Sequence, residues 1–451
     1  MKTICVTLCK DVMTRNIIET DFWPLFREHS DARVIFVVEK GKSFYYENKY
    51  KNQNLEVIEL SSNNCTKVQR ILTYFLRVAI KTESVGYYVM RAKEDGSVSN
   101  FNAYTKMFLS KILGNKLWYK RLLRWSFSKT RSTEAVVNIF DVYKPDLLFA
   151  TSAIDFTFDG VMLNEARRRG IRTVGMTRSW DNLNSHGLVA SLPDRFIFQN
   201  KYLQGVARDH QDVPYSESNV VIGLPHYDIY KHPESIIESR EEFFTHNQLD
   251  LNKKFIFYAA ADMHRSEQVF PQIFDDLLDS GNLSMPSQMI YRLHSSSLVD
   301  RSKIPALKHI ITNDVFGKRK RDAVTEFDTK HYVNCMFHAD IVINAGSSAA
   351  IDAVAFGKPV ICLNFDGGVN LPYWLQSNRM YDQFSHYMKL VTTGGTLLVH
   401  SQEELVVGIN AYLENPMKDN EGRKKILELF VEPYDGKSSN RLARIVVEEL
   451  M

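Results

Sequence analysis

The stretch CMFHADIVINAGSSAAIDAVAFGKPVICLNFDG, residues 335–367, decides the fold. Its apolar run Ile341–Ile343 predicts a buried strand, and the small residues Asn344–Ser348 predict a turn into a helix over Ala349–Phe356. The unbroken run Pro359–Leu363 is typical of a parallel strand that is buried on both faces. A strand, a turn, a helix and a second strand in immediate succession therefore predict an α/β fold with parallel sheets.

The turn before this helix has the chemistry of a diphosphate site. Backbone N–H groups near Asn344, Gly346, Ser347 and Ser348 can face an anion at the start of the helix. Asp352 lies one helical turn further along the same face, where its carboxylate can accept hydrogen bonds from ribose hydroxyls. These five residues predict a nucleotide-diphosphate pocket. The alternative is that the two serines only cap an ordinary helix.

The segment SSAAIDAVAFGKPVI resembles the donor-binding helix of GT-B glycosyltransferases and of the related UDP-sugar 2-epimerases. His-Ala-Asp before the strand and Asn-Phe-Asp-Gly after it resemble bacterial surface-polysaccharide transferases, including capsule and CDP-glycerol transferases. The resemblance implies two Rossmann-like doubly wound domains facing a central cleft. In that arrangement the C-terminal domain typically holds the nucleotide donor and the N-terminal domain holds the acceptor.

Size and composition agree with a globular two-domain protein. The 451 residues suit two domains of about 200 residues each. A net charge of +3, from 56 basic and 53 acidic residues, gives no overall argument for a nucleic-acid partner. Any electrostatic recognition must therefore be local.

Cysteine usage and the N-terminus indicate the cytoplasm. The five cysteines form no metal-binding spacing and no disulfide framework, which fits buried thiols in a reducing compartment. The apolar run Ile4–Leu8 is too short for a signal peptide, and no run of about 18 apolar residues occurs. We expect a cytoplasmic protein, at the inner face of the cell membrane if it contacts lipid.

The first half alternates strands and helices. Expected strands are 2–8, 33–38, 55–60, 147–150, 173–176, 195–199 and 220–224, and expected helices include 14–29, 133–143, 159–169 and 201–209. We predict a Rossmann-like acceptor domain over residues 1–226 and a polar linker over 227–252.

The second half repeats the alternation. Its expected strands, besides those of the opening motif, are 254–259, 288–293 and 308–311, and its expected helices include 268–280, 403–414 and 422–430. We predict the donor domain over residues 253–435. The last helix, within 436–451, is expected to cross back to the N-terminal domain, as the GT-B resemblance implies.

Two loops of the second half carry cations that suit a diphosphate. Arg292 and His294 follow an expected strand directly, and Arg265 lies in the loop after residues 254–259. An Arg-x-His element resembles one in the same polysaccharide transferases, although Ser295 stands here where proline usually follows. The alternative for Arg292 and His294 is an ordinary strand end at the surface.

Acceptor chemistry is predicted in two loops of the first half. In the polar cluster Thr177–Gly187, Trp180 offers a flat wall for a sugar ring, and Asp181 and His186 offer groups that can hold an acceptor hydroxyl. Asp11, in the loop after the first strand, is a rival general base. Structural roles, an Asn/Asp-rich turn for the cluster and a helix cap for Asp11, are the alternatives.

Residues 106–131 contain eight Lys or Arg residues, no acidic residue and several large apolar side chains. This composition is typical of a segment that contacts an anionic membrane. Contact with RNA and ordinary helices docked on the sheet are alternatives. Membrane contact would bring the cleft to a lipid-linked acceptor.

These patterns favour a nucleotide-sugar-dependent glycosyltransferase of bacterial surface-polysaccharide biosynthesis. The donor is a substrate, so no cofactor is expected, and without an Asp-x-Asp motif we expect no metal. No Glu-x7-Glu pair of the kind that many retaining relatives carry is apparent, which favours inversion. The alternatives are a CDP-alditol glycerophospho- or ribitolphosphotransferase, a UDP-sugar 2-epimerase, and a sugar-nucleotide-binding protein without turnover.

Overall fold

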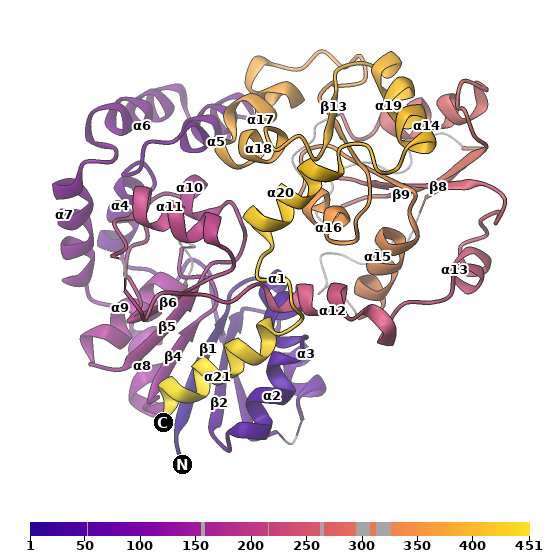
Figure 1. Ribbon diagram of the computed structural model, residues 1–451. Coiled ribbons are helices and arrows are strands. Elements are labelled where there is room, and N and C mark those ends of the chain that lie inside the picture. Colours follow the sequence, from indigo (N-terminus) through magenta and orange to yellow (C-terminus); the bar gives the residue numbers. More distant parts are fainter. Residues whose placement is uncertain (52, 155–157, 215, 262–265, 295–306, 313–325) are drawn as a thin grey trace. The chain divides into compact units, whose positions relative to one another are not determined.

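The computed structural model describes residues 1–51, 53–154, 158–214, 216–261, 266–294, 307–312 and 326–451 (Figure 1). The chain divides into two compact units. Unit 1 contains Met1–Val89, Val98–Lys231 and Leu429–Met451, and unit 2 contains Met90–Ser97 and His232–Glu428. The predicted α/β class, with one parallel sheet in each half, is confirmed.

Unit 1 contains a seven-stranded sheet of order β3-β2-β1-β4-β5-β6-β7, in which each strand pairs parallel to its neighbours. Its strands are β1 (Thr3–Leu8), β2 (Arg33–Glu39), β3 (Leu55–Leu60), β4 (Leu147–Ala150), β5 (Arg172–Met176), β6 (Arg195–Phe198) and β7 (Val220–Val221). The order reverses between β1 and β4. Ligands of doubly wound sheets bind at the carboxyl ends of the strands next to such a reversal.

The helices of unit 1 connect these strands and cover the sheet (Figure 1). They are α1 (Asp11–Met13), α2 (Phe22–His29), α3 (Ser43–Lys49), α4 (Lys67–Leu76), α5 (Glu83–Glu94), α6 (Asn100–Leu113), α7 (Leu117–Ser128), α8 (Glu134–Tyr143), α9 (Phe158–Arg168), α10 (Asn182–Ser185), α11 (Lys201–Gln211), α12 (Asp228–Lys231) and α21 (Ser438–Leu450), with a π-helical turn η1 (Thr14–Ile18) and a 3₁₀ turn η2 (Pro225–Tyr227). The end of α5 belongs to unit 2.

Unit 2 contains a six-stranded parallel sheet of order β10-β9-β8-β11-β12-β13. Its strands are β8 (Lys254–Ala259), β9 (Ser287–Arg292), β10 (Ile310–Thr312), β11 (Ile341–Asn344), β12 (Val360–Leu363) and β13 (Leu397–Val399). Its helices are η3 (Pro233–Ser235), α13 (Arg240–His246), α14 (Phe270–Asp279), α15 (Glu326–His338), α16 (Ala349–Ala355), η6 (Tyr373–Leu375), α17 (Ser377–Gln383), α18 (Ser385–Val391), α19 (Gln402–Glu414) and α20 (Asn420–Phe430), which runs on into unit 1.

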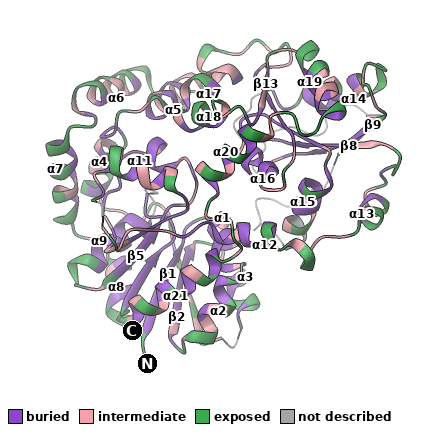
Figure 2. Ribbon diagram, in the orientation of Figure 1, coloured by how far each residue is buried: buried purple, intermediate pink, exposed green. Residues whose placement is uncertain are grey.

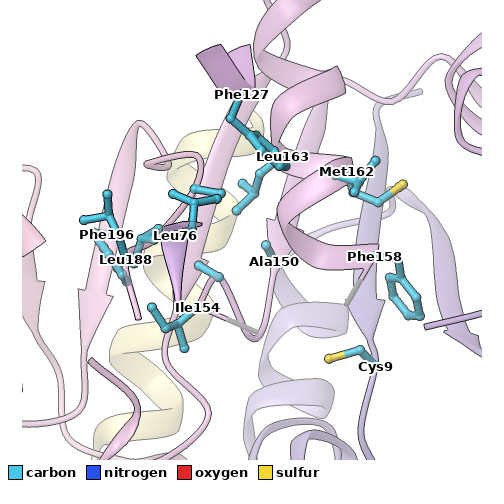
Figure 3. Packing of buried hydrophobic residues seen from close by; sticks show 14 of the residues in the cluster. Cys9, Leu76, Phe127, Ala150, Ile154, Phe158, Met162, Leu163, Leu188 and Phe196 are labelled. Carbon is cyan, nitrogen blue, oxygen red and sulfur yellow. The ribbon is translucent and has the colours of Figure 1, made fainter. Parts of the chain in front are cut away.

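The central strands are buried and mostly apolar because helices cover both faces of each sheet. Every residue of β1, β4, β11 and β12 is buried. Figure 2 shows the strands as the buried interior of each unit, and Figure 3 shows side chains of the unit 1 core around β4 and α9. These cores hold the carboxyl ends of the strands, where the candidate site residues lie.

The helix predicted over residues 14–29 is wrong as one helix. The chain forms α1, the π-helical turn η1 and then a separate helix α2 that begins at Phe22. Pro24 lacks the N–H group that a continuous helix would need, and proline is tolerated in the first turn of a new helix. The hydroxyl of Thr20, which accepts the N–H of Phe22 at 3.2 Å, helps to start α2.

The last helix, α21, packs within unit 1 and is held by a carboxylate at each end. Asp228 accepts the backbone N–H groups of Ser438 at 3.0 Å and Ser439 at 2.7 Å, which are the first residues of α21. At the other end, Glu449 accepts from Arg172 and Arg195 of β5 and β6. The helix is therefore fixed at both ends to unit 1.

We expect Asp228→Ala to lower the free energy of unfolding of unit 1 by about 2 kcal/mol, because two N–H groups at a helix start lose a buried acceptor. Urea unfolding followed by tryptophan fluorescence measures this loss. The control is Asp435→Ala, which removes a half-exposed ion pair with Arg441 and should cost under about 1 kcal/mol. Equal stability of Asp228→Ala and wild type would contradict the cap.

Candidate functional site

The turn between β11 and α16 is fixed by its own residues. Gly346 has φ +71°, and a Cβ atom there would lie 2.2 Å from Cε of Met380, so the position requires glycine. Tyr387 Oη donates to the Gly346 carbonyl at 2.6 Å. The turn therefore has a defined shape before any ligand binds.

The two serines of this turn differ in their contacts. The N–H of Ser347 donates to Asn344 Oδ1 at 3.2 Å, and its hydroxyl accepts the N–H of Ala349 at 3.3 Å. Ser348 is exposed, and its side chain makes no capping hydrogen bond to α16. The reading in which both serines cap the helix thus applies to Ser347 and not to Ser348.

Asp352 lies buried on α16 and is joined to the preceding helix. Its Oδ2 accepts a hydrogen bond from Tyr332 Oη of α15 at 2.8 Å. A carboxylate can accept several hydrogen bonds, so this bond is compatible with a second donor such as a ribose hydroxyl. Tyr332 therefore sets the orientation of the Asp352 side chain.

Arg292, the last residue of β9, contacts α15, the helix that carries Tyr332. Its Cζ lies 5.5 Å from the centre of the Tyr332 ring, and its Nη1 donates to His331 Nδ1 at 2.8 Å. Because an arginine nitrogen is always a donor, His331 accepts at Nδ1 and its Nε2 donates to Asn247 Oδ1 at 3.0 Å. The structure thus brings Arg292 and Asp352 together through His331 and Tyr332.

Sequence reasoning missed His331 and Tyr332. They lie in α15, whose residues form no motif, and the contact arises because β9, β8 and β11 are neighbours in the sheet. The only sign of them in the sequence was that a histidine and a tyrosine stand shortly before the stretch 335–367.

The remaining predicted donor residues lie at the same sheet edge or cannot be placed. His294 follows β9 and is half-buried, and Arg265 lies outside the described residues. The buried Glu267 accepts from Tyr258 Oη at 2.9 Å, Tyr291 Oη at 2.7 Å and the N–H of Ala261 at 3.1 Å. Burial raises the pKa of Glu267 to about 7. This cluster anchors the chain that follows β8.

In unit 1, Asp181 and His186 lie at the two ends of α10 and are connected. Arg178 Nη2 lies 3.4 Å from His186 Nε2, and His186 Nδ1 lies 2.7 Å from Ser185 Oγ, which is 2.9 Å from Asp181 Oδ2. Since Arg178 can only donate, the consistent arrangement is His186 accepting at Nε2, donating from Nδ1 to Ser185, and Ser185 donating to Asp181. In this arrangement the Nε2 lone pair of His186 faces Arg178.

The prediction for Trp180 is wrong. Its ring is buried and packs edge-on against Phe430, with ring centres 5.2 Å apart, so it does not form an open wall for a sugar. Asp11, the first residue of α1, forms an ion pair with Lys42 of α3. Its carboxylate is therefore partly neutralised by a neighbouring cation.

The basic segment covers the second half of α6 and all of α7, and several large apolar residues of these two helices are exposed. Phe101, Tyr104, Phe108 and Ile112 form one exposed stripe on α6, and Trp118, Leu122 and Trp125 form another on α7 (Figure 2). Trp118 is 59% exposed and Trp125 is 60% exposed. Exposed aromatic residues that gather on one surface are typical of a site that binds another protein or a membrane.

Not all of the basic residues of this segment lie on that surface. Lys120 is buried, and Arg124 donates to the carbonyls of Val189 and Gln211. Arg121 forms an ion pair with Asp212 at 3.2 Å. The surface is thus less cationic than the sequence predicts. None of the described helices is long and apolar enough to cross a membrane.

Comparison with solved structures shows the fold. The chain resembles a UDP-GlcNAc 2-epimerase of Neisseria meningitidis, bound to UDP-GlcNAc, with TM-score 0.55 and 11% identity over 99% of this chain and 100% of that one. It also resembles the wall teichoic acid polymerase TagF, with TM-score 0.52 and 11% identity over 100% and 89%. For the calicheamicin glycosyltransferase CalG4, the TM-score is 0.53 at 10% identity over 100% and 98%.

The shared architecture is that of GT-B enzymes with two Rossmann-like domains, which confirms the predicted fold. No curated protein matches the chain. A family model described as CDP-Glycerol:Poly(glycerophosphate) glycerophosphotransferase matches residues 178–448, which is more than half of the chain. The matched range begins at Arg178 beside His186 and includes the Arg292–Asp352 cluster. The chain is a transferase enzyme of surface-polymer biosynthesis and belongs to the CDP-glycerol:poly(glycerophosphate) glycerophosphotransferase family.

Proposed function

We propose that this protein transfers an alditol phosphate, of the glycerol phosphate class, from a CDP-alditol to a hydroxyl of a surface polymer. The family match over residues 178–448 carries this proposal. The sequence alone favours a nucleotide sugar as donor, and that remains the competing donor. Both donors would present a diphosphate and a ribose to the same residues, so these residues do not distinguish them. The family match therefore decides the preference for the CDP-alditol.

In the proposed reaction, the acceptor oxygen forms a bond to the phosphorus of the alditol phosphate. The bond between this phosphorus and the bridging oxygen breaks, and CMP leaves with that oxygen. The acceptor proton passes to the general base. With a nucleotide sugar, the new bond would form at the anomeric carbon, with inversion, and a nucleoside diphosphate would leave. The released nucleotide therefore distinguishes the two donors.

The donor is proposed to bind in unit 2. Asp352, oriented by Tyr332, accepts from the ribose hydroxyls, and Arg292, oriented by His331, pairs with the phosphates. The turn with Asn344, Gly346, Ser347 and Ser348 adds backbone dipoles, and His294 lies at the same sheet edge. Since these groups can stabilise the charge of the leaving nucleotide, the proposed mechanism requires no metal.

His186 is the favoured general base. Its Nδ1 is held by Ser185 and, through it, by Asp181, and the acceptor hydroxyl would take the place of Arg178 as the donor to Nε2. Asp181 is then a positioning residue. Asp11 is less favoured because it is paired with Lys42 and lies outside the range that the family model matches.

The protein is proposed to work in the cytoplasm, on an anionic membrane that holds a lipid-linked acceptor. The support is the pair of exposed apolar stripes on α6 and α7, flanked by the exposed cations Lys111, Lys116 and Lys129. Aromatic side chains insert at the level of the headgroups, and lysines attract anionic lipid.

We expect the protein to release CMP from CDP-glycerol when an acceptor of the poly(glycerophosphate) class is present, with EDTA causing no loss. His186→Asn should reduce this rate at least about a hundredfold, because the base is lost, while CDP-glycerol affinity stays unchanged. Chromatography of the released nucleotide measures the rate, and calorimetric titration measures the affinity for CDP-glycerol. Release of UDP or another nucleoside diphosphate from a nucleotide sugar, with CDP-glycerol inert, would refute the alditol donor.

We expect Asp352→Ala to weaken CMP binding about tenfold or more, because a charged acceptor to ribose is removed. Tyr332→Phe should give a smaller loss, since it keeps the carboxylate and removes only the group that orients it. Calorimetric titration with CMP measures both. Asp276→Ala, an exposed acid of the same unit, is the control. Unchanged CMP affinity in a folded Asp352→Ala protein would remove the ribose role.

For the membrane surface, we expect wild-type protein to float with vesicles containing phosphatidylglycerol and not with neutral vesicles. The double variant Trp118→Ser, Trp125→Ser should lose most of this binding because the inserted rings are removed. Phe44→Ser, which removes a ring that is 76% exposed on α3, is the matched control and should float normally. Equal flotation of both variants would argue against docking through α7.

A further inference from the structure

Helix α15 contacts both the proposed donor site and the segment that leads into α13. His331, Asn334 and His338 are three and seven residues apart, so they share one face of this helix. Asn334 Nδ2 donates to the carbonyl of Ile236 at 2.9 Å. His338 Nε2 donates to the carbonyl of Glu238 at 3.0 Å. This face of α15 therefore fixes the chain on its approach to α13.

His331, on the same face, contacts the end of α13. Asn247, the C-cap of α13, accepts from His331 Nε2 at its Oδ1 at 3.0 Å, and its Nδ2 donates to the carbonyl of Phe243 at 2.8 Å. The second bond fixes which end of the amide faces the ring, because a carbonyl can only accept. His331 thus has an acceptor at Nε2 and a donor, Arg292, at Nδ1. These two partners select the neutral tautomer with its proton on Nε2.

The position of Arg292 depends on this tautomer. Arg292 is buried, and its Nη1 lies 2.8 Å from Nδ1 of His331. If the imidazole gained a second proton, at Nδ1, two donors and two positive charges would face each other across this contact. The hydrogen bond would be replaced by repulsion. Arg292 therefore keeps the position described above only beside a neutral His331.

The neighbours of His331 on α13 and α15 keep one charge state near neutral pH. On α13 the facing side chains, Asn247 and Phe243, are uncharged. On α15, Cys335 Sγ lies 3.5 Å from Nδ1, and burial raises the pKa of this thiol to about 12. Lys330 is held in an ion pair. An imidazole, whose ordinary pKa is about 6.5, is the group of this contact that titrates in the physiological range.

We infer that Asn247 is a positioning residue of the donor site: by accepting from Nε2 of His331 it keeps Nδ1 unprotonated, so that Arg292 is held in place for the donor diphosphate. Donor affinity then falls as the pH drops and His331 gains its second proton. The inference rests on the proposed function, because it concerns the phosphates that Arg292 is proposed to bind.

Two variants move or remove this titration. Asn247→Asp keeps the size and the acceptor oxygen, and its carboxylate beside Nε2 should raise the pKa of His331 because it favours the imidazolium. It also gives up the bond to the Phe243 carbonyl, so urea unfolding is measured to show that the variant is folded. His331→Gln can accept from Arg292 with its amide oxygen and donate to Asn247 with its amide nitrogen, but it does not titrate.

The test is calorimetric titration of the full chain with CDP-glycerol at several pH values. The two phosphates of this donor stay ionised throughout, whereas the phosphate of CMP gains a proton near about pH 6. Between about pH 8 and pH 6, we expect the affinity to fall about threefold in wild type and about tenfold in Asn247→Asp. His331→Gln should bind within about threefold of wild type at about pH 8 and lose this dependence.

The matched control is Asn282→Asp, which adds the same charge at an exposed residue before β9, at the other end of that strand from Arg292. It should follow the wild-type pH profile. His294 is present in every variant, so a dependence that survives in His331→Gln belongs to another group. An equal pH dependence in wild type, Asn247→Asp and His331→Gln would refute the inference.

Nitrogen NMR of isotope-labelled histidine, without ligand, separates this inference from the proposed function. The ring of His331, identified by its absence from His331→Gln, should carry a proton on Nε2 and none on Nδ1, and should gain the second proton at higher pH in Asn247→Asp. The opposite tautomer overturns the inference whatever the donor is. If CDP-glycerol does not bind, the proposed donor fails, and the same pH series with UDP-N-acetylglucosamine decides the inference. Binding of neither would overturn both.

Discussion

The hydrogen bond from Tyr332 to Asp352 is the contact on which the proposed donor site depends. It links α15, which precedes β11, to α16, which follows it, and the same tyrosine ring lies against Arg292 at the end of β9. The end of β9 thus meets the later segment α15–β11–α16 because β9, β8 and β11 are adjacent parallel strands. Their carboxyl ends share one edge of the sheet, so a carboxylate and a guanidinium can address one nucleotide.

Most of the strand and helix pattern was predictable because buried parallel strands are mostly apolar. The runs in β1, β2 and β11 are examples, and the structure has them within one or two residues of the expected bounds. The errors have local causes. Pro24 splits the helix expected over residues 14–29, and β13 was missed because Leu397–Val399 is only three residues long.

The candidate site was less predictable because its decisive contacts join residues far apart in the chain. The turn at Gly346 could be read from local sequence, since its glycine and small neighbours follow a strand. The partners of Asp352 and Arg292 could not, because His331 and Tyr332 carry no motif and reach the site only through the sheet order. Two further predictions failed because the side chains are buried. Trp180 packs on Phe430 and does not form an open wall for a sugar, and Lys120 does not contribute to the basic surface. Composition alone does not distinguish an exposed ring or cation from a packed one.

The packing of α4 fixes the loop that carries His186. The end of this helix lies against the loop at Gly187, where a Cβ atom would be 2.5 Å from Cα of Arg77. The N–H of Leu188 donates to the carbonyl of Leu76, the last residue of α4. Because Leu76 is buried in the core of unit 1, the position of this loop is set by core packing and by a backbone hydrogen bond.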